Sequence, residues 1–218
     1  APSAGGITIR ARIVDSAAAV RGGAEARGAA ADLGSLVDRL TLDLLRDYWG
    51  RRWGVPRPRL AAIGTSSPAA LYDYLRGEAY MQGAQWDSAA SVLERAVGAD
   101  STFALAYLRL AETIGWRLGM ARPAAQAALA AASRLADRLP PRERLLLTVR
   151  RLHVAGAFEA VDSAAALAWR YPDDAEAQYV HGDVRYHAKE TTGRRGAMLA
   201  VASLDSALAL GRGGASAR

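Results

Sequence analysis

The chain has 218 residues, of which 50 are alanine, 27 are arginine and one, Lys189, is lysine, and its net charge is +6. It contains no cysteine, so a disulfide scaffold, a thiolate metal site and a cysteine nucleophile are excluded. The apolar content disfavours intrinsic disorder, and the excess of alanine and leucine favours helices over an all-β sandwich.

No stretch of about 18 uncharged apolar residues occurs, so we expect no membrane-spanning helix. The chain begins at Ala1 rather than at an initiator methionine, which indicates a processed product or a trimmed piece of a longer protein. A removed signal peptide would explain that beginning. We interpret the excess of arginine over lysine, beside abundant alanine and glycine, as codon composition rather than as a binding device.

The first part of the chain predicts two strands and a helix. Apolar and polar residues alternate strictly over residues 7–14, which predicts a half-buried strand, and residues 20–28 predict a weaker second one. Leucines at helical spacing then run from Leu33 to Leu45 and predict a helix that ends near Tyr48. We therefore expect a ββα element over residues 1–48. Because two strands leave exposed edges, we expect them to pair with a partner or another chain.

Residues 49–66 predict a linker, because two prolines and two glycines within 50–59 break any helix. This segment is also the densest basic stretch, with Arg51, Arg52, Arg57 and Arg59. These arginines are a candidate docking site for an anionic membrane or, less expected, for nucleic acid. A merely solvated linker is the alternative that we favour.

From residue 67 to residue 212 the pattern changes to short helices joined by short turns. We expect helices over 69–82, 86–98, 103–117, 123–137, 141–155, 158–170, 175–188 and 197–210. Ser67 and Pro68 predict the first helix start, and a glycine-containing loop over 193–196 precedes the last helix. Residues 213–218 predict a flexible tail.

The spacing of small and large residues over 77–96 is that of a tetratricopeptide repeat. Small residues let two helices approach closely, and large residues fill the gaps between helix pairs. Weaker matches at Ala130, Ala168, Gly182 and Ala207 extend the pattern. We expect a mainly α fold, a right-handed α-solenoid of about four helix pairs preceded by the small ββα element. The expected repeat core is Gly77, Tyr80, Trp86, Ala89, Leu93, Ala96, Tyr107, Leu110 and Ala111.

The stretch over residues 65–107 resembles the tetratricopeptide (TPR) region behind certain bacterial serine/threonine kinases and adenylate-cyclase-like regulators. Residues 139–144 (LPPRER) and 171–176 (YPDDAE) are similar to the later repeats of that family. Residues 7–45 look like the last hairpin and helix of the TolB-like α/β domain that precedes those repeats. The resemblance implies an extracytoplasmic (periplasmic) location peripheral to the membrane, with a cytoplasmic one as the alternative. No kinase or cyclase segment is present, so no signalling chemistry is carried over.

The sequence offers little chemistry. A phosphate-binding loop, a dinucleotide-binding glycine pattern and a nucleophile elbow are all missing, so we expect neither enzyme activity nor a cofactor. His181 and His187 are six residues apart on one predicted helix and therefore point in different directions. Asp183 and His187 have the spacing of two metal ligands, but no third ligand is evident, and we favour an ion pair.

Tetratricopeptide stacks bind partners with the inner face of the first helix of each pair. We expect this face to carry Tyr74, Glu78, Gln82, Leu108, Glu112, Trp116, Arg150, His153, Tyr179, Asp183 and His187. The mixture of aromatic and charged groups suits a protein segment, and a merely solvated groove is the alternative. We expect Trp169 in the core between the third and fourth helix pairs.

These observations predict a non-catalytic protein–protein interaction scaffold, an extrinsic accessory subunit of a larger bacterial assembly that can be membrane-bound. One alternative is a regulatory or sensor fragment of a kinase- or cyclase-type signalling protein. A second is attachment to anionic lipid or nucleic acid through the arginine-rich linker.

Overall fold

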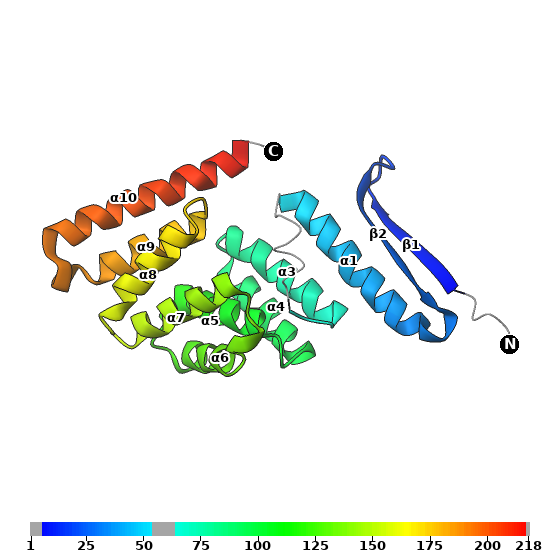
Figure 1. Cartoon of the computed structure of the whole chain (residues 1–218), viewed down its shortest axis with the longest axis horizontal. Helices are drawn as coiled ribbons and strands as arrows, with labels where there is room; N and C mark the ends of the chain where they lie inside the picture. The colour runs from blue at the N-terminus through cyan, green and yellow to red at the C-terminus, as the bar shows by residue number, and fades with distance from the viewer. Residues whose placement is uncertain (1–5, 54–63, 217–218) are drawn as a thin grey trace. The chain divides into compact units, whose positions relative to one another are not determined.

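The computed structural model describes residues 6–53 and 64–216 (Figure 1). Within these ranges, the side chains of 52–53, 189–196 and 212–216 are not described. The chain divides into two compact units, residues 1–138 and 139–218. The first unit contains β1 (Gly6–Val14), β2 (Val20–Ala29), α1 (Leu33–Trp53), α3 (Pro68–Gln82), α4 (Trp86–Ala99), α5 (Ala104–Leu118) and α6 (Pro123–Arg134), with short 3₁₀ turns at Ala30–Asp32 and Ala136–Arg138. The second contains α7 (Pro141–Val154), α8 (Glu159–Arg170), α9 (Ala175–His187) and α10 (Lys189–Ser216).

The fold is mainly helical, with a small antiparallel two-stranded sheet ahead of the helices, as the sequence predicts. Several boundaries differ from the prediction. Helix α6 ends at Arg134 rather than at 137, and α10 continues to Ser216, into the tail predicted over 213–218. The end of α1 and the start of α10 differ as well. Helix α1 continues to Trp53, so the first residues of the predicted linker are helical, and Arg51 supports this turn by pairing with Asp47 at 2.8 Å. Helix α10 begins at Lys189 and runs through the predicted loop over 193–196. Glycine weakens a helix by about 1 kcal/mol but does not forbid it, whereas proline removes a hydrogen bond and clashes.

Strands β1 and β2 pair in a register that places Thr8 opposite Arg27 and Arg12 opposite Gly23. Helix α1 covers one face of this hairpin. Its Leu36 and Leu40 side chains form a small core with the hairpin. The helix lies close to β2, because a Cβ atom added to Gly28 would lie 2.9 Å from the side chain of Leu36. Among the described residues, α1 is therefore the element that packs on this sheet, and it covers one face.

In the first unit, α3 packs on α4, α5 packs on α6, and α4 packs on α5. The start of α3 follows the predicted cap, since the Ser67 hydroxyl accepts a hydrogen bond from Ala70 N at 3.2 Å and Pro68 is the first helical residue. At Gly77 an added Cβ atom would lie 2.7 Å from Leu93 Cγ and Cδ2. The predicted close approach of these two helices is confirmed at this glycine.

The predicted repeat period needs one correction. The first helices of the pairs begin at Pro68 and Ala104 in the first unit, a step longer than the 34 residues of a tetratricopeptide repeat. A longer step shifts the buried position of α6 along the chain. Ala130, expected to be buried by the 34-residue spacing, is exposed, and Ala132 is fully buried instead. Of the other expected core residues, Tyr80, Trp86 and Tyr107 are half-buried, and the remainder are buried.

In the second unit, α7 packs on α8, α8 on α9, and α9 on α10. Gly182 of α9 repeats the role of Gly77, because an added Cβ atom would lie 2.7 Å from Leu204 Cγ and 3.1 Å from the carbonyl oxygen of Ala200. Helix α9 begins at Ala175, directly after Asp174, whose carboxylate caps the helix by accepting hydrogen bonds from Glu176 N at 3.0 Å and Ala177 N at 3.2 Å.

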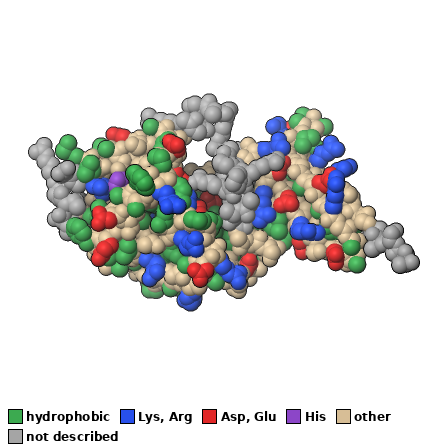
Figure 2. Space-filling view, in the orientation of Figure 1, with side chains coloured by type: hydrophobic (Ala, Val, Ile, Leu, Met, Phe, Trp, Pro, Cys, Tyr) green, Lys and Arg blue, Asp and Glu red, His purple; other side chains and the backbone are tan. Residues whose placement is uncertain are grey.

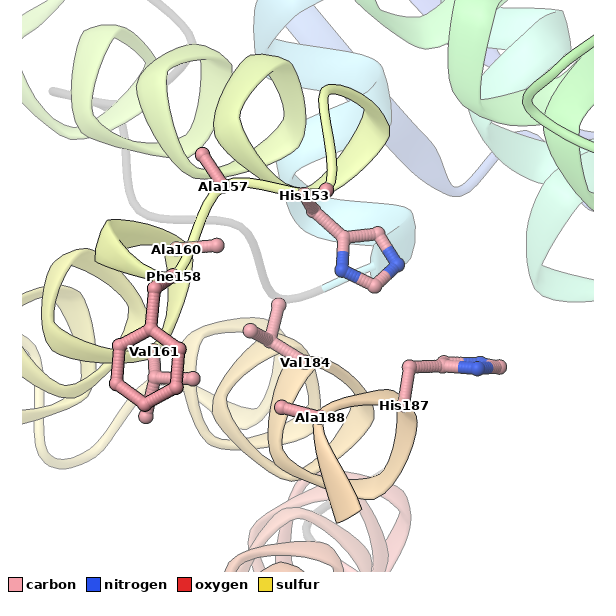
Figure 3. A pocket seen from close by; sticks show the side chains of 9 residues that line it. His153, Ala157, Phe158, Ala160, Val161, Val184, His187 and Ala188 are labelled. Carbon is pink, nitrogen blue, oxygen red and sulfur yellow. The ribbon is translucent and has the colours of Figure 1, made fainter. Parts of the chain in front are cut away.

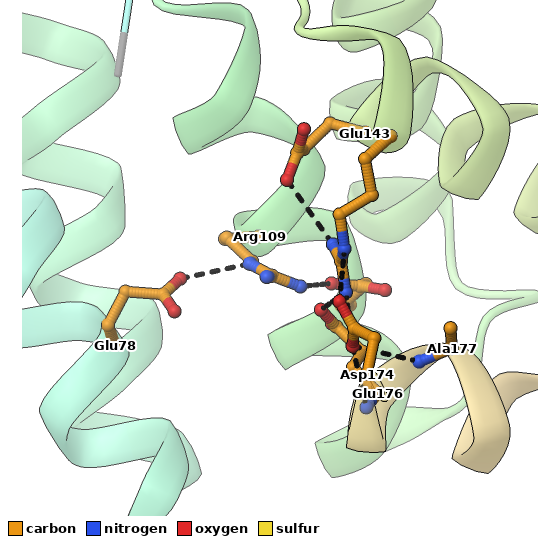
Figure 4. A network of polar contacts seen from close by, with 8 residues as sticks. Glu78, Arg109, Glu143, Asp174, Glu176 and Ala177 are labelled. Atoms are coloured by element: carbon orange, nitrogen blue, oxygen red, sulfur yellow. Dashed lines mark hydrogen bonds and ion pairs between the residues drawn. The ribbon is translucent and has the colours of Figure 1, made fainter. Parts of the chain in front are cut away.

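The buried side chain of Arg142 joins α7 to the start of α9 (Figure 4). It donates to both carboxylate oxygens of Asp174, at 2.7 and 2.9 Å, and to Glu176 at 2.6 Å. A third carboxylate, that of Glu143, lies 3.2 Å away. Because a guanidinium presents several donors in a fixed plane, one arginine ties the helix cap and its neighbours together.

The glycine contact predicts a stability difference between two matched variants. Gly77→Ala should lower the free energy of unfolding by about 1–2 kcal/mol, because overpacking against buried Leu93 outweighs the gain in helix propensity. Gly98→Ala, in α4 with nothing within 4 Å of the added carbon, should raise it by about 0.5 kcal/mol. Urea denaturation followed by circular dichroism measures both. Equal effects of the two substitutions would contradict the close approach.

A second prediction concerns the arginine network. Arg142→Ala should lower the free energy of unfolding of the second unit by about 3 kcal/mol, because it leaves two largely buried carboxylates without their cation. The control is Arg144→Ala on the same helix, whose exposed side chain has no ion pair among the described residues. That control should change stability by less than about 0.5 kcal/mol. In Arg142→Ala the amides of α9 should also be less protected from hydrogen exchange, which measures the loss of stability at this helix.

Candidate functional site

Four of the predicted groove residues meet between α7 and α9 of the second unit. The buried Arg150 donates from Nη1 to Asp183 Oδ2 at 2.9 Å, and His187 Nε2 lies 3.5 Å from Asp183 Oδ1. The rings of His153 and His187 face each other with centroids 5.5 Å apart. Tyr179, one helical turn before Asp183, is half-buried. The structure therefore places these predicted residues on one surface.

A pocket of about 300 Å³ opens beside the two histidines (Figure 3). Its apolar lining includes Ala160, Val161 and Val184, and the exposed ring of Phe158 stands beside it. The pocket is bounded by Gly156, whose φ of 66° lies in the left-handed region and lets the chain turn sharply from α7 to α8. The arrangement combines an apolar cavity with a few polar groups, as small binding pockets do.

The electrostatics favour a neutral His153. Burial lowers the pKa of His153 below its ordinary value, the charges of Arg150 and His187 lower it further, and Asp183 opposes them. The ring is therefore uncharged near neutral pH and can either donate or accept a hydrogen bond. Among the described residues no group of three or more histidines and carboxylates is arranged to hold a metal ion.

The predicted groove residues of the first unit behave differently. Tyr74 and Leu108 are buried, so their side chains are not available to a partner, contrary to the expectation. The Tyr74 ring packs on Phe103 at 5.1 Å, and burial followed by the charge of Glu78 raises the pKa of its phenol well above the usual value. Gln82 is exposed.

Arg109 is a residue that the sequence analysis missed. It is buried on α5, and it pairs with Glu78 of α3 at 2.9 Å and with Glu112 at 2.7 Å (Figure 4). Two predicted groove carboxylates are thereby held by an internal cation rather than presented to solvent. Arg109 and Glu112 are three residues apart on one helix, so their ion pair could have been predicted from the sequence. The ion pair of Arg109 with Glu78 could not, because it depends on how the two helices pack.

Trp116 is, like Gln82, an exposed residue of the predicted face in the first unit. The Trp116 ring, half exposed at the end of α5, stacks on Trp86 of α4 with centroids 5.8 Å apart and planes inclined by 13°. Arg117 and Asp87 form an ion pair between the same two helix ends. Trp86 is thus both a packing residue and part of the surface.

The prediction that Trp169 belongs to the core is wrong, because its side chain is 84% exposed. The buried stripe of α8 includes Leu167 and Ala168, and the next residue is rotated by about 100° away from it. Trp169 instead lines a second pocket of about 330 Å³ with His181, Leu199 and other residues of α8, α9 and α10.

The second pocket contains a serine–histidine contact that does not have the geometry of a nucleophile. Arg185 Nε donates to His181 Nε2 at 2.6 Å, so this nitrogen carries no proton and the other ring nitrogen, Nδ1, does. His181 Nδ1 then donates to Ser203 Oγ at 3.1 Å, and the Ser203 hydroxyl donates to Leu199 O at 3.0 Å. A base that accepts the serine proton is missing from this arrangement.

The predicted basic docking site is described only in part. Arg51 is exposed on α1 and paired with Asp47. The backbone of Arg52 is part of α1, but its side chain is not described. Arg57 and Arg59 lie outside the described residues. In the described ranges, no helix combines the length and apolar character needed to cross a membrane.

Comparison of the chain with models of protein families gives no match, and comparison with curated proteins gives none either.

The half-buried His181 of the second pocket predicts a pH dependence of stability. Burial, and then the charge of Arg185, lower the pKa of His181 to about 4 from an ordinary value of 6.5. The unfolded chain therefore binds a proton between these values and the folded chain does not, so stability should fall as the pH drops from about 6.5 towards 4. His181→Gln should flatten the fall in melting temperature between pH 6.5 and 5. Parallel curves of melting temperature against pH for the variant and the original chain would contradict the lowered pKa of His181.

Proposed function

We propose that the protein is a non-catalytic scaffold of TPR-like helix pairs that binds an extended segment of another protein, as an accessory subunit of a larger assembly. The observation that carries this proposal is the pocket beside His153 and His187, where predicted groove residues from α7 and α9 meet an apolar cavity. The resemblance to tetratricopeptide regions adds the expectation of an extracytoplasmic location.

The chemistry of the pocket supports recognition of an apolar side chain on that segment. Val161 and Val184 offer apolar surface, and the exposed ring of Phe158 can close over an inserted group. A cavity of about 300 Å³ has room for one large side chain with its neighbouring backbone. Insertion of such an anchor into an apolar cavity is the usual energetic centre of a protein interface.

The polar groups beside the pocket support orientation of the bound backbone. Arg150 is buried and bonded to Asp183, so the Asp183 carboxylate is held in one position before a partner arrives. Preorganised groups lose less conformational entropy on binding than flexible surface side chains do. The neutral ring of His153 adds a group that can bond to either a peptide N–H or a peptide carbonyl.

The helix contacts support the repeat interpretation. Gly77 in the first unit and Gly182 in the second each lie where the side chain of a leucine in the following helix leaves no room for a Cβ atom. Both glycines are on the first helix of a pair. This recurrence supports the repeat interpretation, because the pair α3–α4 and the pair α9–α10 depend on the same kind of close contact.

A peptide library tests the proposed pocket. Twelve-residue peptides selected against the full chain should share one large apolar residue, and Phe158→Ala should weaken the best of them about tenfold, because the anchor loses one wall of its cavity. The measurement is isothermal titration calorimetry or fluorescence anisotropy. Because Phe158 is exposed, the substitution should leave the melting temperature nearly unchanged.

The matched control is Trp169→Ala, which removes another exposed aromatic ring of the same unit that does not line this pocket. The control should change the affinity by less than twofold. Loss of binding with Trp169→Ala alone would place the site in the second pocket. Selected peptides without a common apolar residue would contradict the anchor mechanism.

A further inference from the structure

In the described part of the chain, no second strand pairs with the outer edge of β1. Strand β1 has one neighbour, β2, in a two-stranded sheet. Among the described residues, the backbone of Gly6–Ile13 has no hydrogen-bond partner outside β2. The strand is rich in β-branched residues, contains no proline, and has its one irregularity of register at its end, between Ile13 and Val14. Of the usual protections of an edge strand, residues 7–13 lack proline, a bulge and short length, and they have only charged side chains, those of Arg10 and Arg12.

The opposite edge of the hairpin is less suited to a new strand. The backbone N–H of Gly23 in β2 donates to the Asp47 carboxylate of α1 at 2.9 Å. Strand β2 also contains three glycines, which weaken a strand and leave no side chains to pack against a neighbour. The geometry therefore favours addition at β1 rather than at β2.

The apolar face of the hairpin is incomplete on the β1 side. Helix α1 lies close to β2, where Gly22 and Gly28 leave room for it, and Ala26 of β2 is buried. The inward residues of β1 that include Ile7 and Ile9 are only half-buried. A strand added beside β1 would place its own inward side chains next to these isoleucines and cover them.

The outward face carries an excess of positive charge. Arg10 and Arg27 share the single carboxylate of Glu25, and Arg12 lies opposite Gly23 with no carboxylate partner among the described residues. Basic side chains are visible over this hairpin in the space-filling view (Figure 2). A new strand would place its outward side chains beside Arg10 and Arg12, and like charges at such cross-strand positions are destabilising.

We propose that the outer edge of β1 binds an extended segment of a partner protein, with apolar residues facing α1 and acidic residues facing Arg10 and Arg12. A second copy of this chain does not fit, because pairing β1 with another β1 would set arginines beside arginines or threonines and provide no carboxylate. Backbone hydrogen bonds would supply affinity, and the two arginines would select acidic segments. This surface belongs to the first unit and is independent of the pocket in the second.

The test uses the full chain and two nine-residue peptides that alternate isoleucine or valine with a charged residue, glutamate in one and lysine in the other. The glutamate peptide should slow hydrogen exchange of the β1 amides at least tenfold, and the lysine peptide should not. Exchange of individual amides is the informative measurement, because attraction of a peptide to the surface alone does not protect the β1 backbone.

Two charge-reversal variants complete the test. Arg12→Glu should weaken binding of the glutamate peptide at least tenfold and improve binding of the lysine peptide. Arg39→Glu, an exposed residue of α1 with no ion pair among the described residues, should change both affinities less than twofold.

Four results would overturn the proposal. They are binding without protection of β1, equal effects of the two variants, β1 protection that rises with protein concentration when no peptide is present, and equal protection by phosphatidylglycerol vesicles or single-stranded DNA. The third result would mean pairing between copies, and the fourth would mean an unspecific anionic surface.

Discussion

Contact between paired helices at a residue without a side chain is the constraint on which each unit depends. At Gly77 and Gly182 a single methyl group would collide with a leucine of the following helix, and at Gly182 it would also crowd a backbone carbonyl. Close approach fixes the rotation of each first helix about its own axis, because only one face of it carries the glycine. In α9 that rotation buries Val180 and Val184 and directs Asp183 and His187 towards α7. The geometry of the pocket thus follows from this helix packing together with the turn at Gly156 between α7 and α8.

The arginine content has a structural use that composition alone does not reveal. Arg109, Arg142 and Arg150 are all buried, and each is bonded to carboxylates of a neighbouring helix. Lysine could not replace Arg142, since its ammonium lacks the planar set of donors that reaches both oxygens of Asp174. We interpret the number of arginines in the chain as compositional bias, whereas this buried bidentate pairing explains why an arginine is required at position 142.

Helix positions could be predicted from the sequence because their ends carry local signals. Ser67 with Pro68, the Pro140–Pro141 pair and Asp174 each start a helix through chemistry contained within a few residues. The loop predicted over 193–196 failed for the complementary reason, since glycines alone do not end a helix.

Burial was harder to predict than helix position. A rotation of one residue separates the buried Ala168 from the exposed Trp169, and a spacing argument over eight short helices does not resolve it. Tyr74 and Leu108 were expected on a binding face for the same reason. Asp174, which pairs with Arg142, and Asp183, which pairs with Arg150, lie more than 30 residues away from those arginines in the chain, so only the packed structure identifies these two pairs.

The candidate binding surfaces differ in how they would recognise a partner. The pocket of the second unit holds its nearest charges in internal pairs and presents neutral His153 and apolar walls, so it discriminates by shape and by hydrogen bonding. The edge of β1 offers backbone groups, which any extended peptide can satisfy, and it therefore needs Arg10 and Arg12 to discriminate at all. Salt should consequently weaken binding at the strand edge far more than binding at the pocket, because exposed charges are screened and apolar contacts are not. A partner that uses both surfaces would need an acidic, strand-forming segment and a separate apolar anchor, and this combination of features restricts the candidates more than either surface does alone.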